Sequence, residues 1–295
     1  MSNTTQFDAI VIGSGITGGW AAKELTEKGL KTLVLERGRH VEHQKDYVNE
    51  FTPPWQAPNG GLPERELDAR DYPVQSKIER GAFGWANRQY WINDRENPYE
   101  QAKPYRWHRT DVLGGRSLTW GRQSYRWCED DFLANARDGH GNDWPIRYAD
   151  LAPWYAYVEK FIGVSGQPEG RKDFPDGEFL PPFAMTPVER ALKQVIEAKW
   201  KDRCLTVGRV ANLTQAHNGR AQCQSRAICN RGCSFGAYFS SLSSTLPAAR
   251  ETGRLTVRTD SVVEAIDTDP ATGKASAVRV IDSRTGERLT FKAKV

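Results

Sequence analysis

The chain has 295 residues, enough for one large domain or two smaller ones. It carries 41 basic and 37 acidic residues, and this small excess excludes an extended nucleic-acid-binding surface. The longest apolar runs have the length of a strand, so we expect no transmembrane segment.

The N-terminus, MSNTTQFDA, has neither the basic region nor the apolar core of an export signal. We therefore expect the chain to carry no signal peptide of its own. This leaves two predicted locations, the cytoplasm, or the periplasm if the chain is exported together with a partner subunit.

Residues 8–36 read DAIVIGSGITGGWAAKELTEKGLKTLVLE and predict a βαβ unit. A strand at Ala9–Ile12 leads into a G-x-G-x-x-G motif and a helix, and a second strand at Thr32–Leu35 follows. The motif glycines are Gly13, Gly15 and Gly18. In such a unit they permit a tight turn, a close approach of a pyrophosphate, and helix–strand packing, respectively.

Glu36 ends the second strand, about twenty residues after the glycines, where a carboxylate can accept hydrogen bonds from both ribose hydroxyls. A carboxylate there also disfavours NADP, because it would repel the 2′-phosphate. The motif does not distinguish FAD from NAD.

A long irregular stretch over 40–106 is rich in aromatic residues, which favours a loop layer packed over a ligand as much as simple loop packing. A second glycine motif, DVLGGRSLTWGRQSYRW, follows at 111–127. Gly114 and Gly115 allow the backbone to lie against a flat ring or a second phosphate, although a tight turn between strands is the alternative.

Two helices are expected further on. Pro153 suits the first turn of one of them, and the other spans 187–200. The apolar residues expected to face inward on the second helix are Val188, Leu192, Val195 and Ile196.

The tail alternates apolar and polar residues in LTVRT, SVVEAIDT, SAVRVIDS and RLTFKAK, which predicts consecutive β-hairpins. Residues 292–295 still have a strand pattern, without a cap or a closing helix. We therefore expect the chain to be a fragment truncated at its C-terminus.

Cys223, Cys229 and Cys233 lie within eleven residues, and closely spaced thiolates can converge on one metal centre. An iron–sulfur cluster is one interpretation of the three cysteines. Zinc is a second, with His217 as the nearby histidine, and thiols or a disulfide are a third. The isolated Cys128 and Cys204 are expected to be plain buried thiols.

Four segments together resemble the glucose–methanol–choline (GMC) family of FAD-dependent oxidoreductases. They are GSGITGGWAAKEL…LVLERG, VLGGRSLTWGRQSYR, WPIRYADLAPWYAYVE and VRTDSVVEAI. The chain is most similar to the bacterial sugar-dehydrogenase branch, which includes catalytic subunits of glucose, gluconate, fructose and glucoside 3-dehydrogenases.

The resemblance implies that Gly114, Gly115 and Ser117 lie against the flavin and its pyrophosphate, and that the backbone near Val263 contacts adenine. Some members attach FAD through a histidine that precedes a tryptophan. Thr119 occupies that position here, so the resemblance implies non-covalent FAD.

The cysteine spacing resembles the [3Fe–4S] site of the same branch, with Cys223, Cys229 and Cys233 as ligands. That site implies a small partner subunit and a haem or quinone electron acceptor. The family's catalytic histidine lies far toward the C-terminus, and no segment here corresponds to it. The catalytic residues are therefore unknown, and we expect no substrate turnover by these 295 residues.

The expected fold is α/β, with a Rossmann-like FAD/NAD(P)-binding domain and a partial β-rich substrate or cap domain. The discontinuous, incomplete FAD-binding domain is expected to comprise 1–40, 105–150 and 235–295. A flavin-covering loop region should comprise 41–104, and a cap with the cysteine segment 151–234.

The predicted function is oxidation of a CH–OH group in a sugar or polyol. Hydride passes to flavin N5, and electrons leave through the iron–sulfur cluster to an external acceptor. The alternatives are a non-catalytic FAD-binding fragment and an NAD-dependent oxidoreductase.

Overall fold

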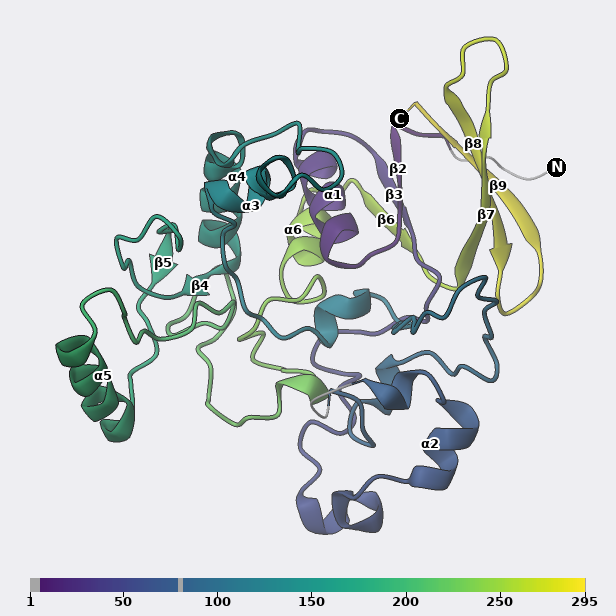
Figure 1. The fold of residues 1–295 in the computed structure, drawn as a ribbon. Coiled ribbons are helices and arrows are strands. Elements are labelled where there is room, and N and C mark those ends of the chain that lie inside the picture. Colours follow the sequence, from purple (N-terminus) through teal and green to yellow (C-terminus); the bar gives the residue numbers. More distant parts are fainter. Residues whose placement is uncertain (1–5, 79–81, 295) are drawn as a thin grey trace. The chain divides into compact units, whose positions relative to one another are not determined.

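The computed structural model describes residues 6–78 and 82–294 and contains two compact units (Figure 1). Unit 1 comprises Met1–Trp120, Ala227–Ser234 and Ser240–Val295. Unit 2 comprises Gly121–Arg226 and Phe235–Phe239. The domain boundaries expected from the sequence remain a prediction.

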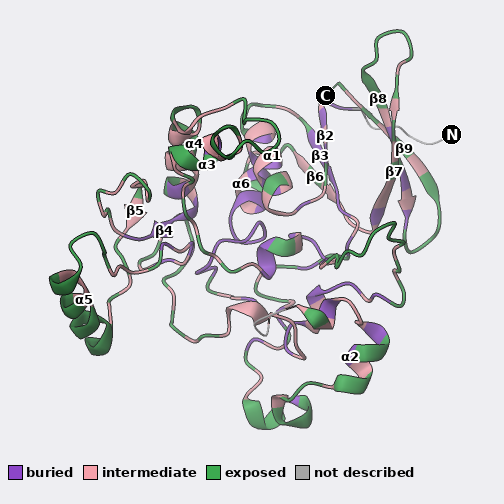
Figure 2. Cartoon of the chain, in the orientation of Figure 1, coloured by how far each residue is buried: buried purple, intermediate pink, exposed green. Residues whose placement is uncertain are grey.

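A three-stranded parallel sheet forms the centre of unit 1. Its strands are β2 (Ala9–Ile12), β3 (Thr32–Leu35) and β6 (Leu255–Arg258), in the order β2-β3-β6. The helices α1 (Ile16–Glu27) and α6 (Thr245–Glu251) pack against each other beside it. All of β3 is buried, as expected for a central parallel strand (Figure 2).

The second sheet of unit 1 has the order β1-β9-β8-β7. Its members are β1 (Gln6–Phe7), β7 (Ser261–Thr268), β8 (Ala275–Asp282) and β9 (Arg288–Ala293). The two hairpins β7-β8 and β8-β9 confirm the expected hairpins of the tail. The strand pattern predicted for 292–295 ends at Ala293, and Val295 lies outside the described residues.

The prediction that 255–259 begins this run of hairpins was wrong. β6 pairs in parallel with β3, with Thr32 opposite Leu255. Parallel strands need a crossover connection, which is usually a helix. The helix α6 directly precedes β6 and provides this connection.

The long stretch after β3 is irregular, as expected. Its described residues form one helix, α2 (Arg65–Asp71), and short 3₁₀ turns at Pro54–Gln56 (η1), Pro58–Gly61 (η2), Gln75–Lys77 (η3), Arg88–Tyr90 (η4) and Gly115–Leu118 (η5). Polar contacts hold it in place. Arg88 pairs with Glu64 and Asp68, at 2.5 and 2.7 Å between nitrogen and oxygen.

Unit 2 is mainly helical. It contains α3 (Glu129–Asp138), α4 (Tyr148–Ile162) and α5 (Pro187–Lys199). The short parallel strands β4 (Val164–Ser165) and β5 (Phe179–Leu180) and the 3₁₀ turn η6 (Cys229–Arg231, in unit 1) complete the elements.

Two predictions for these helices need correction. Pro153 lies inside α4 rather than in its first turn, because the helix already begins at Tyr148, where Asp150 accepts a hydrogen bond from the Arg147 main-chain N–H. The apolar face of α5 does not point inward. Val188 and Val195 are 76% and 61% exposed, and most of α5 is exposed (Figure 2).

The turn at His217–Arg220 closes the C-terminal end of α4. His217 Nε2 lies 2.8 Å from the carbonyl oxygen of Lys160, and Asn218 Nδ2 donates to that of Phe161 at 3.0 Å. Arg220 donates to the carbonyl oxygen of Ile162. These contacts satisfy the last carbonyls of the helix and place a cation at its negative end.

No helix within residues 6–78 and 82–294 is long and apolar enough to cross a membrane.

Candidate functional site

The first glycine loop lies between β2 and α1, at the carboxyl end of the parallel sheet. Gly13 has a φ of +88°, which an L side chain rarely adopts. A Cβ on Gly18 would lie 1.9 Å from the Gly13 carbonyl oxygen, so only glycine permits this packing of helix against loop. Gly15 caps α1 without a side-chain hydrogen bond. The first N–H groups of the helix are therefore available to an anion.

Glu36 is buried directly after β3 and fixes the adjoining loops. Its carboxylate accepts hydrogen bonds from the Ser14 main-chain N–H (2.9 Å), the Ser14 hydroxyl and the Gly38 N–H (2.8 Å). A carboxylate has about four acceptor positions, so these three donors still leave one for a ligand hydroxyl.

The second glycine motif lies against the first. The N–H of Gly114 donates to the Ser14 hydroxyl oxygen at 2.8 Å. Gly114 has a φ of +89°, and a Cβ on Gly115 would lie 3.3 Å from the Cα of Gly15. The structure thus brings together two glycine motifs that are a hundred residues apart.

Ser117 connects the second glycine motif to Ser241. Its hydroxyl donates to the Gly114 carbonyl oxygen at 2.6 Å and accepts from the Ser241 N–H at 3.0 Å. Ser241 in turn donates from its hydroxyl to the Gly15 carbonyl oxygen at 2.9 Å. We call Ser14, Glu36, Gly114, Ser117 and Ser241 the loop junction.

Sequence reasoning missed Ser14 and Ser241. A signal for the second was present in the run FSSLSSTLPAA at 239–249, where five of six consecutive residues carry hydroxyls. Within the described residues, the buried hydroxyls of Thr119 and Thr245 have no hydrogen-bond partner. Such hydroxyls close to the glycine loops, together with the open helix N-terminus, fit a dinucleotide cofactor.

Val263 lies on β7, opposite Val280 of β8, and packs against the core that includes Leu33 and Leu35 of β3. β7 starts beside the candidate site, because the Ser261 N–H donates to the main-chain oxygen of Glu36 at 2.9 Å. The adenine contact expected near Val263 remains a prediction.

The three clustered cysteines belong to different units. Cys223 lies in unit 2, where its N–H donates to the Leu213 carbonyl oxygen at 2.8 Å. Cys229 and Cys233 lie in unit 1, on Ala227–Ser234. In the part of the chain that is described, no three His, Cys, Asp or Glu side chains are placed to hold a metal ion. The described residues therefore do not form a ready metal site.

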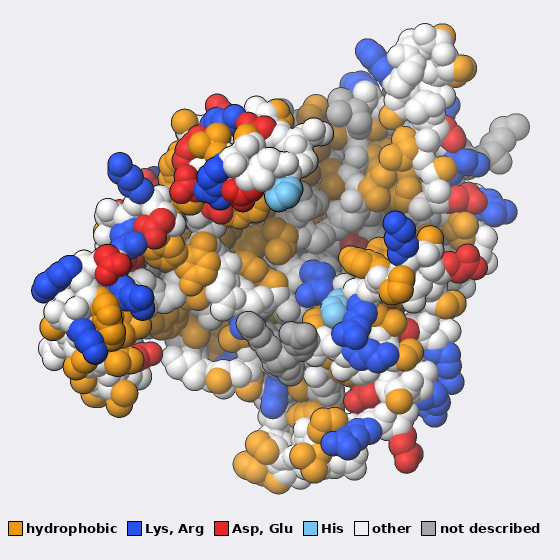
Figure 3. All heavy atoms as spheres, viewed as in Figure 1, with side chains coloured by type: hydrophobic (Ala, Val, Ile, Leu, Met, Phe, Trp, Pro, Cys, Tyr) orange, Lys and Arg blue, Asp and Glu red, His pale blue; other side chains and the backbone are white. Residues whose placement is uncertain are grey.

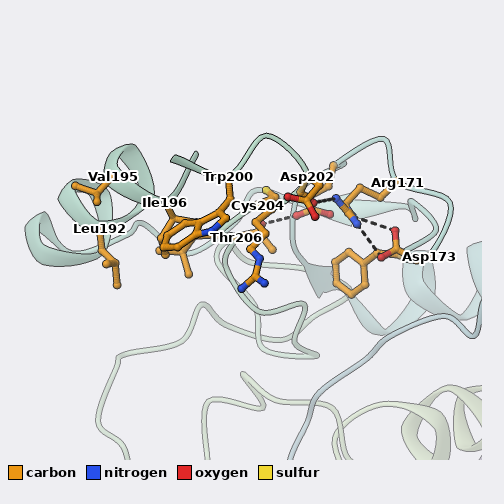
Figure 4. Close-up of a pocket in the computed structure, with 13 residues that line it drawn as sticks. Arg171, Asp173, Leu192, Val195, Ile196, Trp200, Asp202, Cys204 and Thr206 are labelled. Atoms are coloured by element: carbon orange, nitrogen blue, oxygen red, sulfur yellow. Dashed lines mark hydrogen bonds and ion pairs between the residues drawn. The ribbon is translucent and has the colours of Figure 1, made fainter. Parts of the chain in front are cut away.

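Unit 2 contains a cavity of about 840 Å³ beside α5 (Figure 4). Its apolar side is formed by Leu192, Val195, Ile196 and Trp200. Its polar side includes Arg171, which pairs with Asp173 at 2.9 Å. The volume is that of a small-molecule site.

No protein-family model matches the chain. Over 96% of its length it is 24% identical to the fructose dehydrogenase large subunit of Gluconobacter japonicus, of which the match covers 50%. It is 26% identical to 6‴-hydroxyparomomycin C oxidase of Streptomyces lividus, over 98% of the chain and 47% of the relative. It is also 26% identical to 2-methyl-1,2-propanediol dehydrogenase of Mycolicibacterium austroafricanum, over 100% of the chain and 49% of the relative.

Among solved structures, pyridoxine 4-oxidase from Mesorbium loti matches with a TM-score of 0.51 and 16% identity. The match covers 97% of this chain and 48% of that one, and it confirms the α/β fold with a partial second domain. The chain spans about half the length of the curated relatives it matches. As the motifs predicted, the chain is similar to GMC-type FAD-dependent oxidoreductases over nearly its whole length.

Proposed function

We propose that this chain binds FAD non-covalently and forms the flavin-binding part of an oxidoreductase acting on CH–OH groups of a sugar or polyol. The loop junction carries the proposal, because it joins both glycine motifs where a dinucleotide binds in α/β sheets. The substrate class is supported by the names of two relatives, a fructose dehydrogenase and a propanediol dehydrogenase.

Each part of the site has a separate task in this proposal. The N–H groups at the start of α1 bind the pyrophosphate, and Glu36 accepts hydrogen bonds from the adenosine ribose. Gly114 and Gly115 permit close approach of the flavin end. The bound flavin would supply the hydride acceptor. The base that takes the hydroxyl proton has no assignment among the described residues.

Replacing Glu36 with Ala tests the ribose assignment. We expect the affinity for FAD to fall by about 10- to 100-fold, since a charged hydrogen-bond acceptor contributes about 1–3 kcal/mol. The measurement is a titration of FAD-free protein, followed by quenching of flavin fluorescence.

Ser14→Ala is the matched variant, because it removes the hydroxyl contacts to Glu36 and Gly114 but keeps the carboxylate. We expect a smaller loss of affinity than for Glu36→Ala. Glu251→Ala, at the exposed end of α6, should leave the affinity unchanged. The ribose assignment is wrong if Glu36→Ala loses no more affinity than Ser14→Ala.

We further propose that the electrons leave to an external acceptor held by a partner subunit, and that Cys223, Cys229 and Cys233 ligate a [3Fe–4S] cluster on that route. The support is the spacing of three soft ligands in eleven residues and the name of one relative, a large subunit.

Metal analysis tests the cluster. Protein purified anaerobically from cells that assemble iron–sulfur clusters should contain about three irons per chain, with the paramagnetic signal of an oxidised three-iron cluster. Cys229→Ser should lose the iron and the paramagnetic signal. Cys204→Ser, which lies outside the triplet, should keep the iron and the signal. Stoichiometric zinc, or protein free of metal, would contradict the proposal without affecting FAD binding.

A further inference from the structure

Residues 227–234 carry two of the three clustered cysteines and lie in unit 1, although the residues on both sides of them belong to unit 2. We call this segment the cysteine strap. It begins at Ala227, whose φ of +56° lies in the left-handed region that an alanine side chain disfavours. The strap is therefore strained where it starts, and contacts with the rest of unit 1 must hold it in place.

A buried carboxylate makes the first of these contacts. Lys, Arg, Asp and Glu side chains are spread over the surface drawn in Figure 3, whereas Glu50 is only 2% exposed. Its two oxygens accept hydrogen bonds from the Ser234 N–H at 3.0 and 3.1 Å, and one of them also accepts from the Ser234 hydroxyl at 3.1 Å. Ser234 directly follows Cys233 in the sequence. Hydrogen bonds to a charged acceptor are stronger than those between neutral groups, so Glu50 attaches the strap firmly.

Two tyrosines support the rest of the strap. The Tyr90 hydroxyl donates to the Arg231 carbonyl oxygen at 2.8 Å, and a Cβ on Gly232 would collide with the Tyr47 ring. The strap thus rests directly on that ring. Both tyrosines belong to the buried core that includes Leu113 of the second glycine motif. The strap is therefore fixed to the same core that supports one of the two candidate cofactor-binding loops.

We propose that Glu50 is a positioning residue for the thiols of Cys229 and Cys233. While its carboxylate accepts hydrogen bonds from Ser234, the strap stays on unit 1 and both thiols are partly buried. Loss of the carboxylate allows the strained backbone at Ala227 to relax, and the strap detaches by local unfolding. The proposal concerns where the thiols lie, so it holds whether they ligate a cluster, zinc or no metal.

Tryptic digestion of the folded chain measures detachment, because a protease cleaves a packed segment while that segment is locally unfolded. Cleavage after Arg231 should be at least about 10-fold faster in Glu50→Ala than in the parent, since the lost hydrogen bonds involve a charged acceptor. Ala227→Gly relieves the backbone strain and should slow this cleavage. Cleavage after Lys274, in the exposed connection between β7 and β8, should be equal in all variants.

Alkylation of the metal-free protein with iodoacetamide reports on the thiols themselves, with the exposed Cys204 as the internal reference. In Glu50→Ala, Cys229 and Cys233 should react faster than in the parent, at rates that approach the rate of Cys204. Glu50→Gln removes the same charge but keeps an oxygen that accepts from the Ser234 N–H. It should therefore leave both strap thiols close to their parent rates.

Two results would overturn the proposal. The first is a Glu50→Ala variant in which cleavage after Arg231 is no faster than in the parent. The second is equal thiol reactivity in Glu50→Ala and Glu50→Gln, which would assign the effect to the charge of Glu50 rather than to its contact with the strap. Cooperative urea unfolding shows that each variant is folded. Should Glu50→Ala fail to fold, unchanged cleavage in Ala227→Gly, which keeps every side-chain contact of Glu50, would equally contradict the proposal.

Discussion

Replacing Gly18 with Ala should destabilise unit 1 by about 3 kcal/mol and lower the affinity for FAD by at least about 100-fold. The added methyl group would lie 1.9 Å from the Gly13 carbonyl oxygen and 3.4 Å from the Val11 side chain. Backbone atoms cannot rotate away, so α1 must separate from the loop. Urea unfolding followed by circular dichroism measures the first effect, and flavin fluorescence titration measures the second.

Gly15→Ala is the matched control, because a Cβ there has no atom within 4 Å. We expect its stability without FAD to remain within about 0.5 kcal/mol of the parent. Its affinity for FAD should still fall, since the methyl group would occupy the space through which a pyrophosphate approaches. If Gly15→Ala binds FAD as tightly as the parent does, the pyrophosphate does not lie on this loop.

Glu159→Ala should destabilise unit 2 by about 3–5 kcal/mol. Glu159 and Arg126 form a buried bidentate pair, at 2.8 Å from Nε to Oε1 and 2.6 Å from Nη2 to Oε2. Glu159 also accepts a hydrogen bond from the Glu178 N–H at 2.8 Å. Removing the carboxylate leaves a buried guanidinium without its counter-charge. Urea unfolding followed by tryptophan fluorescence measures the loss.

Two further variants distinguish burial of the pair from simple loss of a charge. Glu197→Ala breaks the partly exposed pair with Lys193 on α5 and should change stability by about 0.5 kcal/mol or less. The double variant Arg126→Met, Glu159→Leu should recover part of the loss, since it leaves no unpaired charge. A Glu159→Ala effect as small as that of Glu197→Ala would show that the pair is solvated.

The βαβ unit was predictable from sequence because its determinants are local. The glycine spacing, the apolar periodicity and the acid after β3 all lie within thirty residues, and β2, α1 and β3 confirm the prediction. β6 was misassigned because its pattern fits a hairpin strand and a parallel strand equally. The preceding helix α6, which decides between them, was not predicted.

The loop junction depends on contacts that no local pattern encodes. Ser14 contacts Gly114 across 100 positions, and Ser241 contacts Gly15 across 226. Similarly, the periodicity of α5 identifies its apolar face correctly but gives no information on what covers that face. The turn at His217–Arg220 was also missed, because its partners are the last carbonyls of α4.

The most direct test of the account is a comparison of three ligands on the FAD-free 295-residue chain by isothermal titration calorimetry. FAD should bind with one site per chain. FMN should bind at least about 100-fold more weakly, because it lacks the second phosphate and the adenosine ribose that the α1 N-terminus and Glu36 are proposed to hold. NAD⁺ should bind more weakly than FAD. Tight binding of NAD⁺ without binding of FAD, or equal affinities for FMN and FAD, would contradict the central claim.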